Sequence, residues 1–208
     1  MAWNISRRSG RGTLAFLGLA AALGAAAIAG AQPAYRSWRI SDAPPQIRER
    51  VSRADLIIVA MQDSVLRELT GALASGSTAS ALTFCHVDAG AATRRIAAGQ
   101  HVEAGRTSDR LRNPANAPRP WAAPFVSANS GKASKDVEGF VVDLGDRIGV
   151  LRPISQRPMC ASCHGPKEKL DAELKTALAR RYPSDTAVGF KEGEIRGWFW
   201  VELPASPR

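Results

Sequence analysis

Residues 137–154 have the sequence VEGFVVDLGDRIGVLRPI, in which two apolar segments flank the turn residues Gly-Asp-Arg at 145–147. Short segments that are rich in β-branched residues and meet at such a turn predict a β-hairpin. Its two strands are expected over 137–144 and 148–154. The hairpin predicts two strands of an antiparallel sheet.

Two further segments have the same short, alternating texture and predict additional strands over 102–108 and 195–203. Trp198 and Trp200 are two residues apart in the second of these segments, so they are expected on one face of the sheet. The segment 112–120 contains three prolines, which lack the N–H donor and restrict the residue before each of them. It predicts a loop.

Helical periodicity appears before the sheet and once within it. Apolar residues recur at helical spacing over 47–74, and a second helix is expected from the capping candidates Ser77 and Thr78 to Ala98. A third helix is expected over 167–181. Helices that precede an antiparallel sheet, with one helix inserted into it, predict an α+β fold.

The first 31 residues predict a signal peptide, which is excluded from the fold. Three arginines precede an uncharged run rich in Ala, Leu and Gly that ends in small residues suited to signal peptidase. A retained membrane anchor is the alternative, although an apolar run of under about 20 residues is marginal for a membrane span. We therefore expect a periplasmic or other extracytoplasmic protein, associated with the membrane only if the anchor is retained.

The remaining chain is expected to hold a linker over 32–46, one domain over 47–204 and a tail over 205–208. The formal net charge is +9, and the loss of the three signal arginines lowers it to +6. The basic residues are spread along the chain and form no Lys/Arg block, so nucleic acid is not an expected partner. An acidic redox protein or an anionic membrane surface suits this charge.

Cys160-Ala161-Ser162-Cys163-His164 has the C-x-x-C-H pattern of c-type haem attachment. The two thiols add across the haem vinyl groups as thioethers, and the adjacent imidazole binds iron as the proximal ligand. Export fits this chemistry, because c-type haem is attached outside the cytoplasm. The motif predicts one covalent haem c held by Cys160, Cys163 and His164.

Two other uses of these residues compete with haem attachment. A Cys160–Cys163 disulfide of the thioredoxin type would suit a cytosolic βαβ setting, which the pattern lacks. Structural zinc is the second alternative, because Cys85 completes a Cys₃His set with Cys160, Cys163 and His164. Cys163 and His164 are neighbours, however, and adjacent ligands make an awkward bite for one tetrahedral ion.

The ligand opposite His164 stays open on the residues alone. The candidates with a sulfur or imidazole are Cys85, His86, His101 and Met159. Met159 directly precedes Cys160 and is better explained as core filling. Cys85 and His86 are neighbours on a predicted helix and point about 100° apart, so only one of them can face iron.

A set of spaced motifs extends from residue 106 to residue 197. It consists of RTS at 106–108, RNPANAP at 112–118, RPI at 152–154, the attachment motif with Gly165, and Y-P-x-D-x-A-x-G-F-x-x-G-E-I-R-G at 182–197. Together these motifs resemble the PAS-like monohaem cytochrome c domain family, formerly catalogued as a domain of unknown function. Members occur alone or as the extracytoplasmic sensor module of histidine kinases.

The resemblance covers about 47–204 and implies a PAS-like antiparallel sheet with amino-terminal helices. It also implies iron bound by the motif histidine, His164, and by a cysteine on an amino-terminal helix, here Cys85. His86 provides an alternative imidazole at the adjacent position. A thiolate ligand would stabilise Fe(III) and give a low reduction potential. Arg106 and Arg112 are candidates to neutralise the haem propionates.

The predicted function is electron transfer by a monohaem cytochrome, with a separate redox protein as partner. The alternative is a redox or gas sensor in which NO or CO displaces Cys85, with its output passed to a separate transducer. We do not expect an enzyme, because two protein ligands leave no open iron position and the sequence offers no evident distal acid or base.

Overall fold

The computed structural model describes residues 1, 35–76 and 78–204, apart from the side chains of residues 75, 79, 80 and 83–89. The predicted signal peptide and the tail lie outside this part of the chain. Among the helices that are described, none is both long and apolar enough to cross a membrane.

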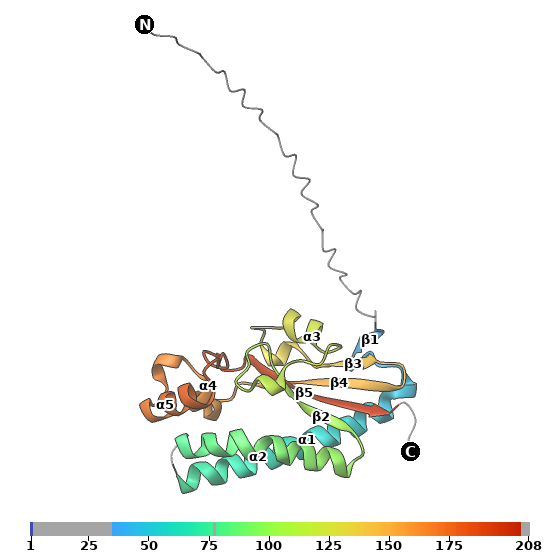
Figure 1. Cartoon of the computed structure of the whole chain (residues 1–208). Helices are drawn as coiled ribbons and strands as arrows, with labels where there is room; N and C mark the ends of the chain where they lie inside the picture. Colours follow the sequence, from blue (N-terminus) through green and yellow to red (C-terminus); the bar gives the residue numbers. More distant parts are fainter. Residues whose placement is uncertain (2–34, 77, 205–208) are drawn as a thin grey trace. The chain divides into compact units, whose positions relative to one another are not determined.

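Five antiparallel strands form one sheet in the order β1-β3-β4-β5-β2 (Figure 1). The strands are β1 (Ser37–Arg39), β2 (Glu103–Thr107), β3 (Phe140–Asp143), β4 (Arg147–Ser155) and β5 (Ile195–Pro204). The predicted hairpin is confirmed, because β3 pairs with β4 from Phe140 opposite Leu151 to Asp143 opposite Ile148. Gly145 in its turn has a φ of 88°, a conformation that glycine adopts without strain.

Two long helices, α1 (Pro45–Ser75) and α2 (Thr78–Gly99), lie side by side along one face of the sheet (Figure 1). Alternate residues of β5 point toward this helix pair, and Phe199 and Val201 are buried there against Met61 of α1. Burial of such side chains contributes roughly 1.5–3 kcal/mol each. The two helices were predicted with nearly these bounds.

The remaining helical elements are short except for α5. They are η1 (Pro114–Asn116), α3 (Ala123–Ala128), η2 (Ser134–Asp136), η3 (Pro158–Cys160), α4 (Ala161–His164), η4 (Lys167–Lys169) and α5 (Ala172–Arg181). The predicted helix over 167–181 is therefore divided. Asp171 accepts hydrogen bonds from the backbone N–H groups of Glu173 and Leu174, which starts α5 at residue 172.

Two short elements differ from the sequence prediction. Residues 37–39 were expected in a linker, but they form β1, in which Trp38 pairs with Val141. The segment 123–128 forms α3, which no periodic pattern indicated. It covers the second face of the sheet, where Val126 packs in a cluster with Trp198 and Trp200. The prediction that the two tryptophans share a face is confirmed.

Close approach of an indole ring explains a glycine in the central strand β4. A Cβ atom on Gly149 would lie 2.7 Å from the ring of Trp121, so a side chain cannot be placed there without moving the indole. The strand thus presents bare backbone to Trp121, which is itself buried. Trp121 is fixed further by its Nε1, which donates to Glu202 at 2.8 Å.

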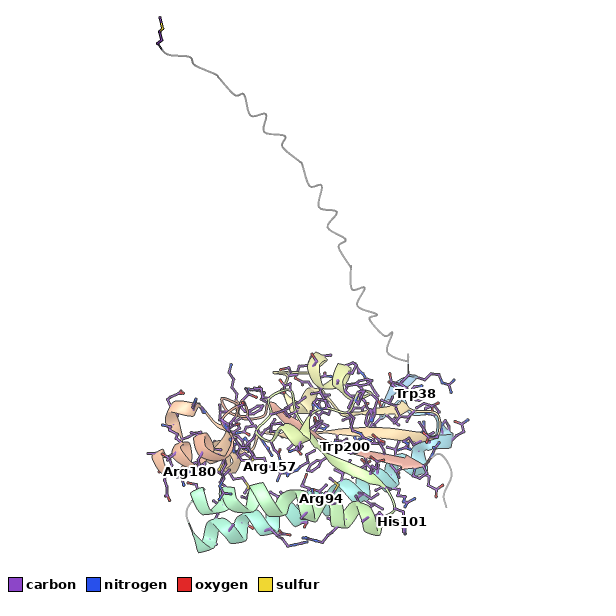
Figure 2. All side chains as sticks on the ribbon, in the orientation of Figure 1. Trp38, Arg94, His101, Arg157, Arg180 and Trp200 are labelled. Atoms are coloured by element: carbon purple, nitrogen blue, oxygen red, sulfur yellow. The ribbon has the colours of Figure 1, made fainter. Side chains whose placement is uncertain are left out.

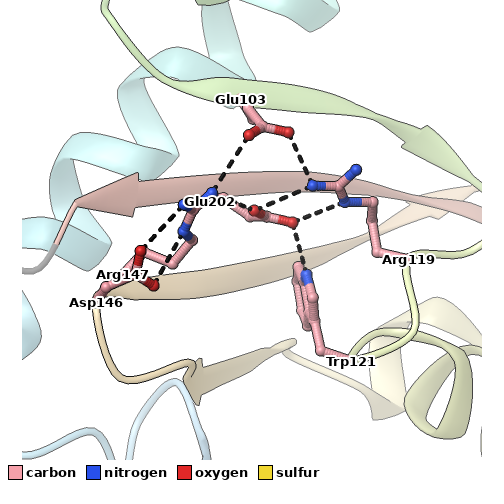
Figure 3. A network of polar contacts seen from close by, with 6 residues as sticks. All are labelled: Glu103, Arg119, Trp121, Asp146, Arg147 and Glu202. Atoms are coloured by element: carbon pink, nitrogen blue, oxygen red, sulfur yellow. Dashed lines mark hydrogen bonds and ion pairs between the residues drawn. The ribbon is translucent and has the colours of Figure 1, made fainter.

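Glu202 is the centre of a charge network at one end of the sheet (Figure 3). Its carboxylate is 5% exposed and accepts bonds from Arg119 Nε at 2.8 Å and Arg147 Nη1 at 3.2 Å. Both arginines also contact Glu103 of β2. Burial alone would raise the pKa of Glu202, but bonds from Arg119 and Trp121 outweigh it, so the pKa lies below its ordinary value.

Candidate functional site

The attachment segment follows β4 and forms one tight helical turn. Cys160 ends η3 and His164 ends α4, so both cysteines and the histidine lie within a single short segment. Cys160 and Cys163 are half-buried free thiols, not the disulfide that was one alternative. The turn therefore presents two free thiols and one imidazole within five residues.

The imidazole of His164 is oriented by a backbone carbonyl. Its Nδ1 lies 2.7 Å from the oxygen of Ala187, and because a carbonyl only accepts, Nδ1 carries the proton. Nε2 is left with a lone pair. Burial, assisted by the positive charges of Arg196 and Arg112, holds the pKa of His164 well below its usual value. The ring is thus neutral, oriented and suited to bind a metal through Nε2.

A strap formed by residues 185–190 holds the attachment turn in place. The Gly189 N–H donates to Gly165 O at 2.8 Å, and the Phe190 N–H donates to His164 O at 3.0 Å. The Phe190 ring meets the His164 ring edge-on, with centroids 6.3 Å apart. The strap was part of the quoted sequence motif, but no role was predicted for it.

A cavity of about 290 Å³ opens in front of His164. Its walls come from α2, the carboxyl end of β2, the loop containing η1, and the adjoining ends of β4 and β5. The described lining residues are Gly90, Arg94, Arg106, Thr107, Ser108, Arg110, Leu111, Arg112, Asn113, Ala115, Asn116, Ile154, His164, Tyr182, Ala187, Arg196 and Gly197. Both predicted arginines, Arg106 and Arg112, are therefore brought together with His164.

Charge makes this cavity suited to an anionic group. Five of its described lining residues are arginines and none of them is acidic. Two of the arginines have carboxylate partners behind the wall: Arg110 pairs with Glu194, and Arg112 pairs with Asp185. The guanidinium of Arg110 also stacks on Phe190, 3.5 Å from the ring centroid.

A buried hydroxyl in the cavity wall has no partner among the described residues. The hydroxyl of Thr107 is buried, and it makes no hydrogen bond within the described part of the molecule. A buried hydroxyl without a partner is costly, so such a group marks a place where a guest can supply one. Together with two thiols, a neutral imidazole and an arginine-rich wall, it fits a large anionic metal cofactor such as haem.

Two of the four candidates for the opposite ligand are placed by the structure. His101 is exposed at the carboxyl end of α2, away from Arg157 and the attachment segment (Figure 2). Met159 is 40% exposed, so the prediction that it fills the core is wrong; it lies in the exposed 3₁₀ turn η3. Neither residue lines the cavity.

Cys85 and His86 both belong to α2, but their side chains lie outside the described residues. Their neighbours in the helix are informative. Leu82 packs in a cluster that includes Cys163, and Gly90 lines the cavity. The part of α2 between these two residues, about two turns long, therefore runs from the cluster that Cys163 borders to the cavity.

The zinc alternative is not decided by the described residues. Within them, no group of three or more His, Cys, Asp or Glu side chains is arranged to hold a metal ion. The proposed zinc set includes Cys85, whose side chain falls outside that search. Haem attachment needs only the two thiols and one imidazole that the turn provides.

Comparison with known proteins identifies the family and the fold. The sequence model of a family described as Tll0287-like matches residues 41–204. The crystal structure of the cyanobacterial haem protein Tll0287 matches with a TM-score of 0.58 and 23% sequence identity, over 80% of this chain and 99% of that one. No curated protein matches the chain. The structural likeness confirms the α+β, PAS-like fold.

Proposed function

The chain belongs to the Tll0287-like family, and on that basis we propose that it is an exported monohaem c-type cytochrome that transfers single electrons. The observation that carries the proposal is the orientation of His164. Its Nδ1 is bound to Ala187 O, which leaves Nε2 available beside an arginine-lined cavity and two free thiols. The family relative of known structure is itself a haem protein.

Each residue of the attachment turn has a defined part in this proposal. The sulfurs of Cys160 and Cys163 form the two thioether links, and His164 binds iron. Haem supplies a metal that cycles between Fe(III) and Fe(II). The protein holds it, excludes water and sets its potential through ligands and neighbouring charges. Arg106 neutralises a haem propionate, and its position in the cavity wall suits this role.

We propose that Cys85 would serve as the second protein ligand of the iron, with His86 as the alternative. The family resemblance supports Cys85. The course of α2 supports this part of the helix for either residue, because Leu82 belongs to the cluster against which Cys163 packs and Gly90 lines the cavity. A thiolate favours Fe(III), so the potential is low relative to a His/Met cytochrome. A second protein ligand also fills the iron coordination sphere, which supports electron transfer over catalysis.

A ferric absorption spectrum tests both the haem and its ligand. The full chain is produced with a c-type maturation system, and haem content is measured on denatured protein. We expect covalent haem in the wild type and a thiolate-to-iron charge-transfer band that is lost in Cys85→Ala and kept in His86→Ala. Absence of this band from the wild type, with a ferric spectrum that changes in His86→Ala but not in Cys85→Ala, would assign His86. Wild-type protein without covalent haem would refute the cytochrome function.

A sensor is the second candidate, and the position of α2 favours it. The helix that carries the proposed ligand packs along α1. Displacement of that ligand by a gas would therefore change the packing of the two helices. Titration of the ferrous protein with NO and CO separates the two functions. Unchanged spectra at saturating gas would exclude sensing by ligand displacement and leave electron transfer.

A further inference from the structure

Arg112 makes contacts that its expected role as a propionate partner does not explain. Its Nε donates to Asp185 Oδ2 at 3.0 Å, and its Nη2 donates to Cys163 O at 2.7 Å and to Ala187 O at 3.3 Å. The side chain is 12% exposed and that of Asp185 is 9% exposed. A buried ion pair is costly unless its hydrogen bonds are made, and here both partners are bonded further.

Asp185, the first residue of the strap 185–190, binds both Arg112 and the backbone of the strap. Its Oδ1 accepts from the Ala187 N–H at 2.8 Å, while its Oδ2 holds Arg112. The peptide units on both sides of Ala187 are therefore tied down, one through its N–H and the other through its carbonyl oxygen. That oxygen is the acceptor for His164 Nδ1.

The carbonyl of Ala187 is thus shared between an imidazole and a cation. A carbonyl that also accepts from a guanidinium is a weaker acceptor for His164, because the cation draws electron density from it. A weaker acceptor leaves the imidazole with less anionic character and makes Nε2 a poorer electron donor to a metal. The positive charge also favours the reduced metal.

We propose that Arg112, anchored by Asp185, is a positioning residue that fixes His164 through Ala187 O and raises the reduction potential of the bound haem. The inference deepens the proposed function and rests on it. Arg112 acts through the Ala187 carbonyl and is not itself an iron ligand. It offsets part of the decrease in reduction potential that a thiolate ligand produces.

Arg110 provides a matched control within the same wall. It also lines the cavity and pairs with a carboxylate, Glu194, and it donates to the carbonyl of Val188, the residue after Ala187. That carbonyl is not the acceptor of His164 Nδ1. Arg110→Gln therefore removes one positive charge near the site without changing the shared acceptor.

The test is a spectroelectrochemical titration of haem-loaded protein, with the ferric EPR spectrum as a second readout. For Arg112→Gln we expect the ferric-to-ferrous ratio at a fixed potential to rise about tenfold, which is about 59 mV for one electron. The shift in Arg110→Gln should be smaller. Equal shifts in the two variants would reduce the effect of Arg112 to charge alone and overturn the positioning role.

Arg112→Lys provides a second test for the case in which Arg112→Gln does not bind haem. The ammonium retains the charge but cannot reproduce the planar fork that reaches three acceptors. We expect a smaller potential shift in the same direction and an altered EPR spectrum, whereas values identical to wild type would overturn the proposal. Wild-type protein without covalent haem would instead refute the proposed function, so the two failures are distinguishable.

Discussion

The two ends of the strands β2, β4 and β5 are built in opposite ways. At one end, Glu202 lies opposite Glu103 in the strand register, and its buried carboxylate is surrounded by donors (Figure 3). At the other end, Thr107 lies opposite Trp198 and next to an arginine-rich cavity, and its hydroxyl has no partner in the part of the chain that the structure describes.

Within one sheet, the residues that stabilise the fold are therefore separate from the residues that are proposed to bind the cofactor. A buried charge whose hydrogen bonds are all made within the protein needs no further partner, and removal of one of its partners destabilises the fold. A wall rich in arginine, with a buried hydroxyl that has no partner among the described residues, gains hydrogen bonds when a complementary anionic group binds. The Glu202 end is therefore complete by itself, whereas the His164 end is built to hold a guest. Substitutions at the two ends should separate stability from cofactor binding.

Removal of both thiols should give the largest effect, at the His164 end alone. In the variant Cys160→Ser with Cys163→Ser, covalent haem is expected to be absent, because a hydroxyl does not form the thioether. Haem staining after denaturing electrophoresis measures this directly. Glu202→Gln is the control from the other end and should retain covalent haem. Equal staining in wild type and the double variant would show that the cysteines do not attach haem.

Loss of the carboxylate at the other end should lower stability without affecting haem attachment. Glu202→Gln leaves the buried indole N–H and two guanidinium groups with a poorer acceptor, at a cost of about 2 kcal/mol in the free energy of unfolding. Urea unfolding of the haem-free protein measures it. Asp146→Asn is the matched control, since Asp146 is exposed and bonds only Arg147 in this network; little change is expected there.

Acid should weaken the Glu202 end selectively. The pKa of Glu202 in the folded protein lies below its unfolded value of 4.5, so its stabilising contribution is complete above that pH. The contribution is lost as the pH falls through the lower, folded-state pKa. The stability difference between wild type and Glu202→Gln should therefore shrink as the pH is lowered from 6 to about 3. A constant difference across this range would contradict the network's charged state.

The smallest effect is expected at Thr107. In the variant with Cys160→Ser and Cys163→Ser, Thr107→Val removes a buried hydroxyl that has no partner among the described residues, and it should raise stability by less than about 1 kcal/mol. In the haem-loaded protein the gain should disappear, because the cofactor then supplies a partner. Urea unfolding of both forms measures the contrast. A loss of stability in the haem-free form would mean that the hydroxyl is already satisfied.

Much of the fold was accessible from the sequence, because its main elements have strong local signals. The helical spacing predicted α1 and α2, and the turn at 145–147 predicted the β3–β4 hairpin. The three residues of β1 had no such signal, since their pairing with β3 is a tertiary contact. The start of α5 was available in principle from the capping residue Asp171, but the charged segment before it resembled helix.

The candidate site divides in the same way. The attachment motif and the positions of Arg106 and Arg112 beside it were predicted from residue types. The contribution of Ala187 was not, because it acts through its carbonyl oxygen, and a backbone group leaves no signature in the side-chain sequence. Arg112 was predicted only as a partner for an anion. Its contacts with two backbone carbonyls could not be predicted, because only the fold brings these groups together.

The central claim, that the His164 end holds covalent haem, is tested most directly by mass spectrometry of the protein made with a c-type maturation system. We expect the intact polypeptide to be heavier by one haem. After digestion, that added mass should lie on the peptide that contains Cys160 to His164. A polypeptide of unmodified mass, with Cys160 and Cys163 both open to alkylation, would contradict the claim.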